Sequence, residues 1–548
     1  MTQAPHTTTV SEHLGLSPAS AVAPAPALPR RARYFLPSLA DIVFSSVLFA
    51  AFGALGPSLL GDADIGWHIR NGDHILTTHS VPHADYFSYT LAGRPWYAWE
   101  WLYDVVVSKM HSHAGLDGVV LLSSFLGALT FAWLFRLALK LSGNLVVAGG
   151  LTLLSATAAS IHLLARPHLV TWLLTLAWFE QVSSYQRGER RHLFLLPALM
   201  PAWVNLHGGF LVGVALLAVA VAANLWTRYT AAAPESRRHA RERLRHLSLV
   251  FSLTLVATLL NPYGYRLYIH LYSYLGDRFL MDNISEFLSP DFHLAQVKTF
   301  ALLLIATLVA LAVKKNRTAP LDVLVLGISA WIGLYATRNI PIASILLTLT
   351  IAPILGGAIR ESMHDGGTAE WLRTLAEKSE GFSSRIIATD GRLRGHAFAA
   401  VATVTLVVVG LRPGRTELAF DAKKMPVQAA EYMAAHNIRN HFLSPDGWGG
   451  YLIYRLYPDV RMMIDDRHDF YGPEYVRDYM KTVRSGYGWR DLLDAKAVNW
   501  VLVPPDYPLA NTLKAVPDWK VVYDDGTAII FTRAGAMKAQ SAASARPD

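Results

Sequence analysis

Long uncharged apolar runs, separated by short clusters of Lys and Arg, are the feature that most restricts the fold of this chain. A helix needs about 20 mostly apolar residues to cross a bilayer. Eleven candidate spans follow one another along the sequence: 36–60, 118–135, 145–164, 169–185, 193–206, 209–226, 247–260, 300–313, 321–336, 340–359 and 397–411. Only 16% of the residues are charged, against about 25% in soluble domains. We therefore expect a polytopic α-helical membrane protein.

The distribution of basic residues predicts the orientation of these spans, because Lys and Arg gather in cytoplasmic loops. With a cytoplasmic N-terminus, five loops hold most of the Lys and Arg between the spans: 136–140, 186–191, 228–245, 314–317 and 360–394. The net charge of +8 then reflects topology and does not indicate a nucleic-acid partner. The chain has no Cys, which excludes disulfides, thiolate metal sites and a Cys nucleophile.

Composition divides the chain into four parts. Residues 1–33, rich in Ala, Pro, Thr and Ser, are predicted to be a disordered cytoplasmic segment. Residues 34–412 form the membrane domain, 413–534 a soluble α/β domain on the outer side, and 535–548 a flexible tail. Inside the α/β domain the patterns predict helices over 427–435, 475–482 and 509–516, and strands over 460–464, 500–503, 519–523 and 528–532.

The first outer loop, 61–117, begins with Asp62-Ala63-Asp64 directly after the first span. Acidic residues at the mouth of a membrane helix are costly and therefore indicate function. In a short helix over 64–76, Asp64 and His68 would share one face. Apolar residues at helical spacing later in the loop predict a second helix lying in the membrane interface: Trp99, Leu102, Tyr103, Val106 and Met110.

Glu100 and Asp104 would share a face of this second helix. For Asp104 the simpler interpretation is a solubilising surface residue, and for Glu100 a surface role and a functional role are equally favoured. Six histidines also lie in the loop: His68, His74, His79, His83, His111 and His113. Imidazole and carboxylate are suitable zinc ligands. No diagnostic spacing is present, however, so surface and loop positions are the preferred interpretation for most of them.

Polar residues also collect at the outer ends of several other predicted spans. They are Arg166-Pro167-His168, Asn205 to Gly209 with His207, Asn261-Pro262-Tyr263-Gly264, Glu286 and Arg338-Asn339. For a single turn of this kind, helix capping or interface anchoring is a sufficient explanation. As a set on one face of the membrane, they predict a shared cavity, because irregular backbone at this depth is tolerated where it lines protein or water.

With these motifs the chain resembles the GT-C class of integral-membrane glycosyltransferases. The resemblance lies in the Asp62-Ala63-Asp64 motif with Trp67-His68, in Asp85 to Thr90, in Gly93-Arg94-Pro95-Trp96 and in Glu100-Trp101-Leu102. The Arg166, Asn205, Asn261 and Arg338 turns resemble those of a largely uncharacterised group of bacterial membrane proteins assigned to this class. The resemblance implies a multi-pass protein of the bacterial inner membrane. Its acidic motif would act on the periplasmic side.

The resemblance further implies an inverting transfer from a polyprenyl-phosphate sugar to a lipid, glycan or protein acceptor. Asp64 is the expected general base, with Asp62 as the other candidate. Arg338 and Arg166 would hold the leaving phosphate, and Glu286 would orient the acceptor. The remaining substrate-binding candidates are His68, Glu100, His168, Asn205, His207, Asn261 and Asn339. In some relatives a divalent cation, Mg²⁺ or Mn²⁺, bridges this motif and the phosphate, and the resemblance leaves open whether Asp62 and Asp64 hold one here.

The chain departs from known GT-C members at two places, and three rival functions remain open. The chain has Asp-x-Asp where protein O-mannosyltransferases commonly have Asp-Glu, and it lacks the WWDYG signature of oligosaccharyltransferases. A flippase for lipid-linked sugars would show internal repeats, which the sequence lacks. The other rivals are a ligase that moves a preassembled glycan between lipids and a non-catalytic assembly protein. The polar run 465–469 either reaches the acceptor or membrane cavity, or is a simple strand-to-loop transition.

Overall fold

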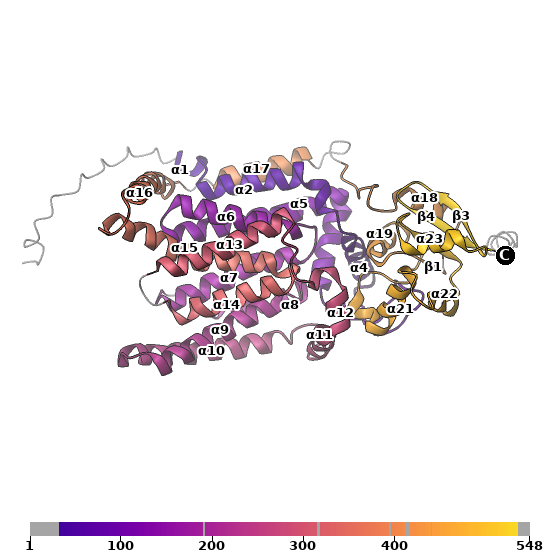
Figure 1. The fold of residues 1–548 in the computed structure, drawn as a ribbon, viewed down its shortest axis with the longest axis horizontal. Helices are drawn as coiled ribbons and strands as arrows, with labels where there is room; N and C mark the ends of the chain where they lie inside the picture. The colour runs from indigo at the N-terminus through magenta and orange to yellow at the C-terminus, as the bar shows by residue number, and fades with distance from the viewer. Residues whose placement is uncertain are drawn as a thin grey trace, which may run out of the picture.

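The structure is a computed structural model that describes residues 32–189, 192–314, 318–393, 396–410, 417–439 and 441–534. Long helices lie side by side in a bundle, and the C-terminal α/β unit, coloured yellow, lies at one end of it (Figure 1). The predicted disorder of residues 1–31 and the predicted flexible tail at 535–548 lie outside the described residues. The helical membrane protein with a C-terminal α/β unit is the predicted fold class, and it is confirmed.

The helices of the bundle have the following bounds: α1 Ala32–Phe35, α2 Leu39–Phe49, η1 Ala50–Ala54, α3 Gly56–Leu59, α4 Asp64–Thr78, α5 Trp101–Ser142, α6 Leu145–Ala159, η2 Ser160–His162, α7 His168–Gln186, α8 Leu195–Leu206, α9 Phe210–Thr230, α10 Pro234–Ala257, α11 Arg266–Gly276, α12 Arg278–Asn283, η3 Ser285–Phe287, α13 Ala295–Val313, α14 Pro320–Tyr335, η4 Thr337–Asn339, α15 Ile340–His364, α16 Glu370–Asp390 and α17 His396–Gly410. Each predicted span overlaps helical residues, the first of them α2, η1 and α3 in succession, but the count of eleven membrane spans is not confirmed. Six helices in the described ranges are long and apolar enough to cross a membrane.

The first span shows how the sequence sets a helix start. Ser38 is the N-cap of α2, and its hydroxyl accepts a hydrogen bond from the Asp41 backbone N–H at 3.2 Å. The Asp41 carboxylate accepts in return from the Ser38 backbone N–H at 2.9 Å. This reciprocal capping box satisfies N–H groups that have no partner inside the helix. The helix continues as a π-helical segment, η1, before it meets the outer loop.

The outer loop contains both predicted helices. The first is α4, which begins at Asp64 as expected and ends at Thr78. The second is the N-terminal part of α5, where non-helical dihedrals at Ala114 and Gly115 separate the loop helix from the membrane span. Gly115 has φ +59°, a conformation that costs little only for Gly. The loop helix and the membrane span that follows it are therefore two helices joined at this break.

The C-terminal unit contains a four-stranded sheet in the order β1-β2-β4-β3. Its strands are β1 Phe442–Leu443, β2 Trp500–Val503, β3 Trp519–Asp524 and β4 Ile529–Arg533. Only β1 and β2 pair in parallel. Its helices are α18 Val427–Ala435, α19 Asp446–Leu456, α20 His468–Tyr471, α21 Pro473–Val483, α22 Arg490–Ala495 and α23 Pro508–Ala515.

Most predicted elements of this unit are confirmed, and one is wrong. Helix 427–435 is α18, and strands 500–503, 519–523 and 528–532 correspond to β2, β3 and β4. The predicted strand 460–464 is not part of the sheet. Its apolar residues are buried instead against the outer loop, where Met462 forms a single bridge with Ser88. The apolar residues of this segment are buried, but their partner is the outer loop and not the sheet.

Candidate functional site

Two glycines bring the acidic motif against the C-terminal unit. A Cβ on Gly66 of α4 would lie 2.2 Å from the Gly450 carbonyl oxygen of α19. A Cβ on Gly450 would lie 2.3 Å from the Ala63 carbonyl oxygen. Only hydrogen fits at both positions, so the backbones of α4 and α19 touch. Ala63 stands between Asp62 and Asp64, and α19 therefore supports the motif directly.

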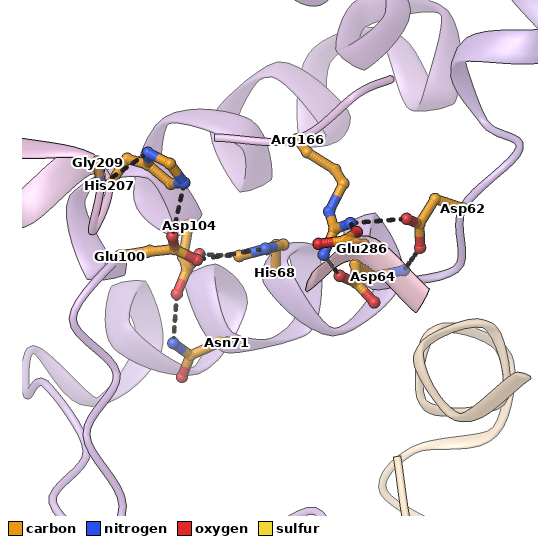
Figure 2. A network of polar contacts seen from close by, with 10 residues as sticks. All are labelled: Asp62, Asp64, His68, Asn71, Glu100, Asp104, Arg166, His207, Gly209 and Glu286. Carbon is orange, nitrogen blue, oxygen red and sulfur yellow. Dashed lines mark hydrogen bonds and ion pairs between the residues drawn. The ribbon is translucent and has the colours of Figure 1, made fainter. Parts of the chain in front are cut away.

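Arg166 lies at the centre of a cluster of ion pairs, which we call the Arg166 cluster: Asp62, Asp64, Arg166, Glu286 and Arg338. Its guanidinium contacts Asp62 at 2.9 Å and also pairs with Asp64 and Glu286 (Figure 2). Arg338 lies 3.9 Å from the second oxygen of Glu286. These residues come from the loop before α4, the first residue of α4, the turn before α7, η3 and η4. The sequence prediction that distant outer turns converge is therefore correct for these positions.

Solvent reaches the Arg166 cluster. The side chains of Asp62 and Glu286 are each 26% exposed and that of Arg166 is 21% exposed, whereas Asp64 is 8% exposed. Burial alone would raise the pKa of Glu286, but Arg166 and Arg338 outweigh it and hold this pKa well below its ordinary value. Glu286 is therefore ionised at neutral pH. Such a partly open, charged cluster is suited to binding and proton transfer.

A second cluster, the His68 cluster, lies beside the first: His68, Asn71, Glu100, Asp104 and His207 (Figure 2). His68 Nδ1 lies 2.5 Å from Asp104 Oδ1, and its Nε2 lies 3.8 Å from Glu100. Asn71 donates to the other Asp104 oxygen at 2.5 Å. Asp104 was expected on the surface, and that expectation is wrong, because its side chain is fully buried. The loop helix packs this face against α4, which a helical pattern alone does not reveal.

Within the His68 cluster Glu100 connects His68 to His207, whose Nε2 lies 3.6 Å from a Glu100 carboxylate oxygen. Burial raises the pKa of Glu100 to about 7, although the nearby His68 opposes the shift. Burial also places the pKa of His207 well below its ordinary value. His207 Nδ1 accepts a hydrogen bond from the Gly209 N–H at 3.0 Å. In the neutral ring the proton is therefore on Nε2, which faces Glu100.

The other predicted site residues take local structural contacts. Asn205 accepts from Trp101 Nε1 at 2.6 Å and donates to the Leu260 carbonyl at 2.8 Å. The Asn261 amide closes its own turn through Thr258 and Gly264, and Asn339 donates to Ile332. His168 Nε2 lies 2.6 Å from the His162 carbonyl. In the described contacts His168, Asn205 and Asn339 hold the turns that carry Arg166, His207 and Arg338, whereas Asn261 holds its own turn.

Asp466, from the C-terminal unit, meets the acidic motif. One carboxylate oxygen each from Asp62, Asp64 and Asp466 lie within 4.8 Å of one another. Both Asp466 oxygens are shielded from solvent, and neither accepts a hydrogen bond in the described part of the chain. The polar run 465–469 was the sequence signal, and Asp466 within it lies against the acidic motif of the membrane domain.

Arg467, the next residue, ties the outer loop to the C-terminal unit through what we call the Arg467 cluster: Asp85, Trp96, Asp465, Arg467 and Tyr471. Its guanidinium binds Asp465 at 2.7 and 2.8 Å and Asp85 at 2.9 Å. The guanidinium also lies 4.5 Å from the centre of the Trp96 ring. All three charged side chains are at most 3% exposed. This cluster holds Asp466 opposite the acidic motif.

Solved structures with a similar fold cover most of the chain. The oligosaccharyltransferase of Archaeoglobus fulgidus in its apo form matches with TM-score 0.50 and 10% identity over 91% of this chain and 74% of that chain. The chain has the GT-C fold. ArnT from Cupriavidus metallidurans bound to undecaprenyl phosphate matches with TM-score 0.47 and 14% identity over 90% of this chain and 98% of that chain. No protein-family model and no curated protein sequence matches the chain.

Within this GT-C fold, sequence reasoning found the charged residues of the Arg166 cluster and missed Asn71, Asp104 and Asp466 as neighbours of the site. Asn71 and Asp104 are placed by the packing of α4 on α5. Asp466 is placed by the docking of a unit that is about 400 residues away from Asp64 in the sequence. Only the dense polar run 465–469 could have drawn attention to Asp466.

Proposed function

We propose that the protein is a membrane glycosyltransferase that moves a sugar from a polyprenyl-phosphate donor to a hydroxyl acceptor on the periplasmic side. The observation that carries this proposal is the Arg166 cluster at one end of the bundle, with carboxylates and guanidinium groups from four outer turns. A donor anchored in the bilayer would present its phosphate at this end. The acceptor would be a lipid, glycan or protein that enters from the outer side.

Asp64 is the proposed general base. It accepts the proton of the acceptor hydroxyl while the hydroxyl oxygen bonds to the anomeric carbon of the sugar. The bond from that carbon to the phosphate oxygen breaks, and the electron pair leaves with the polyprenyl phosphate. Attack from the face opposite the phosphate inverts the anomeric centre. The contact with Arg166 fixes the orientation of the Asp64 carboxylate.

The two arginines have different proposed roles. Arg166 is already paired with three carboxylates, so its charge is largely compensated. Arg338 has one distant carboxylate partner at 3.9 Å, and its side chain is 36% exposed. Arg338 is therefore the better candidate to hold the leaving phosphate as negative charge develops on it. Arg166 would instead position Asp64 and Glu286.

The test compares Asp64→Asn with the wild type in a transfer assay on purified protein with defined polyprenyl-phosphate sugars. We expect transfer to fall by about 10²- to 10⁴-fold, the usual contribution of a general base, with an unchanged melting temperature. Asp459→Asn is the matched control, because Asp459 is an exposed aspartate of the C-terminal unit. Undiminished transfer by Asp64→Asn would exclude the base. Lipid scrambling without any transfer by the wild type would indicate a flippase.

A further inference from the structure

We propose that Asp466 of the C-terminal unit is a ligand of a divalent cation that also binds Asp62 and Asp64, so that the cation joins the two parts of the molecule. The sequence resemblance suggested at most a cation on Asp62 and Asp64. The new element is the third carboxylate, which comes from the other part of the chain. The inference concerns metal binding and stands independently of glycosyl transfer.

The environment of the Asp466 carboxylate favours a bound cation. Its two carboxylate oxygens are buried, and among the described residues neither accepts a hydrogen bond. A buried carboxylate without a partner is costly, and two more carboxylates within 4.8 Å increase the repulsion. Arg467, its neighbour in sequence, is directed instead to Asp85 and Asp465. A bound cation would remove both costs.

The three carboxylates have the composition and spacing of a site for a divalent cation. Mg²⁺, Mn²⁺ and Ca²⁺ prefer carboxylate oxygens, and two oxygens on opposite sides of a Ca²⁺ ion at about 2.4 Å lie about 4.8 Å apart. The three oxygens lie within that limit. The group contains no His or Cys, which disfavours zinc. The residues therefore fit a hard divalent cation.

The formal charges of the acidic residues and the arginines at this site do not balance. Asp62, Asp64 and Asp466, together with Glu286, carry four formal negative charges. Arg166 and Arg338 supply two positive charges in the same cluster. The two uncompensated negative charges equal the charge of one divalent cation. When bound, such a cation would supply positive charge for an anionic ligand at this site.

Contacts between the membrane domain and the C-terminal unit fix the position of Asp466 relative to Asp62 and Asp64. Tyr89 N–H donates to the Met462 carbonyl at 2.9 Å, and Met462 N–H donates to the Phe87 carbonyl at 2.9 Å. Together with the buried Arg467 cluster, this pairing fixes the backbone on one side of Asp466. The contact of Gly66 with Gly450 fixes α4 and the acidic motif on the other side. The three carboxylates are thus held by rigid contacts that do not involve the cation.

The experiment measures Mn²⁺ binding by electron paramagnetic resonance on the purified full-length protein after removal of metals with EDTA. We expect one Mn²⁺ per chain, and at least a tenfold weaker affinity in Asp466→Asn. Asp459→Asn is the control and should bind as the wild type does. Because no sugar donor is present, the result is separate from the transfer assay. Binding by Asp466→Asn with wild-type affinity, or no binding by the wild type at millimolar Mn²⁺, would overturn the proposal.

Thermal unfolding is a second measurement, in which the expected effect of Asp466→Asn on the melting temperature depends on whether metal is present. Without metal, Asp466→Asn should melt at a higher temperature than the wild type, because it removes a buried, repelled charge. With Mn²⁺, the wild type should gain stability through binding, whereas Asp466→Asn should gain little. A purely structural role for Asp466 predicts a lower melting temperature in both conditions, and that result would contradict the proposal.

Discussion

The Arg166 cluster and the Arg467 cluster use the same chemistry in two different environments. Each places one guanidinium among carboxylates from distant parts of the chain. The charged side chains of the Arg467 cluster are at most 3% exposed, whereas Asp62 and Glu286 in the Arg166 cluster are 26% exposed. A fully desolvated network serves to fix two surfaces together. An open network leaves its charges accessible to a ligand.

Replacing each arginine by Met is the strongest test of this comparison. Arg467→Met leaves Asp85 and Asp465 buried without a counter-charge, which typically costs about 3–5 kcal/mol. Arg166→Met should cost less stability, because solvent reaches Asp62 and Glu286, but it should abolish transfer. Thermal unfolding in detergent and the transfer assay separate the two effects. Equal losses of melting temperature in both variants would remove the distinction between the clusters.

In exposure Glu100 lies between the Arg467 cluster and the Arg166 cluster. Its side chain is 15% exposed and weakly paired to His68. Burial raises its pKa from 4.5 to about 7. Between these values the folded protein binds more protons than the unfolded chain, so the stability from this group falls as the pH rises from about 4.5 to about 7. Above about pH 7 the loss is complete, at up to about 3 kcal/mol.

Glu100→Gln should remove this pH dependence, so the melting temperature of the variant should exceed that of the wild type most at pH 8 and least at pH 5. Melting curves from pH 5 to pH 8 provide the measurement. Glu474→Gln, at an exposed position of α21, should keep the wild-type dependence. Parallel curves for wild type and Glu100→Gln would show that Glu100 titrates normally in the folded protein.

Gly450→Ala should give the smallest loss of stability and still reduce transfer. Its Cβ would meet the Ala63 carbonyl oxygen at 2.3 Å, and overpacking of this kind costs about 1–3 kcal/mol. The displacement would move Asp62 and Asp64, which flank Ala63. Gly447→Ala is the matched control in the same helix, because nothing lies within 4 Å of its added Cβ. Equal transfer rates in the two variants would show that the α4–α19 contact does not support the motif.

The sequence by itself determined the membrane-embedded helices, because apolar length and the position of basic residues are local properties of the chain. It also determined β2, β3 and β4 of the C-terminal unit, whose apolar pattern matches a sheet. It placed Asp62, Asp64, Arg166, Glu286 and Arg338 at the ends of predicted helices on one face of the membrane.

Only the tertiary structure decided which of these residues meet. Arg166 meets both Asp62 and Glu286, and Asp104 is buried under His68, through packing that no local pattern encodes. Segment 460–464 is not a strand of the sheet because it pairs with the outer loop, through the bridge between Met462 and Ser88. Asp466 faces Asp62 and Asp64 because glycines on α4 and α19 allow backbone contact. Such contacts depend on the close fit of surfaces that are hundreds of residues apart.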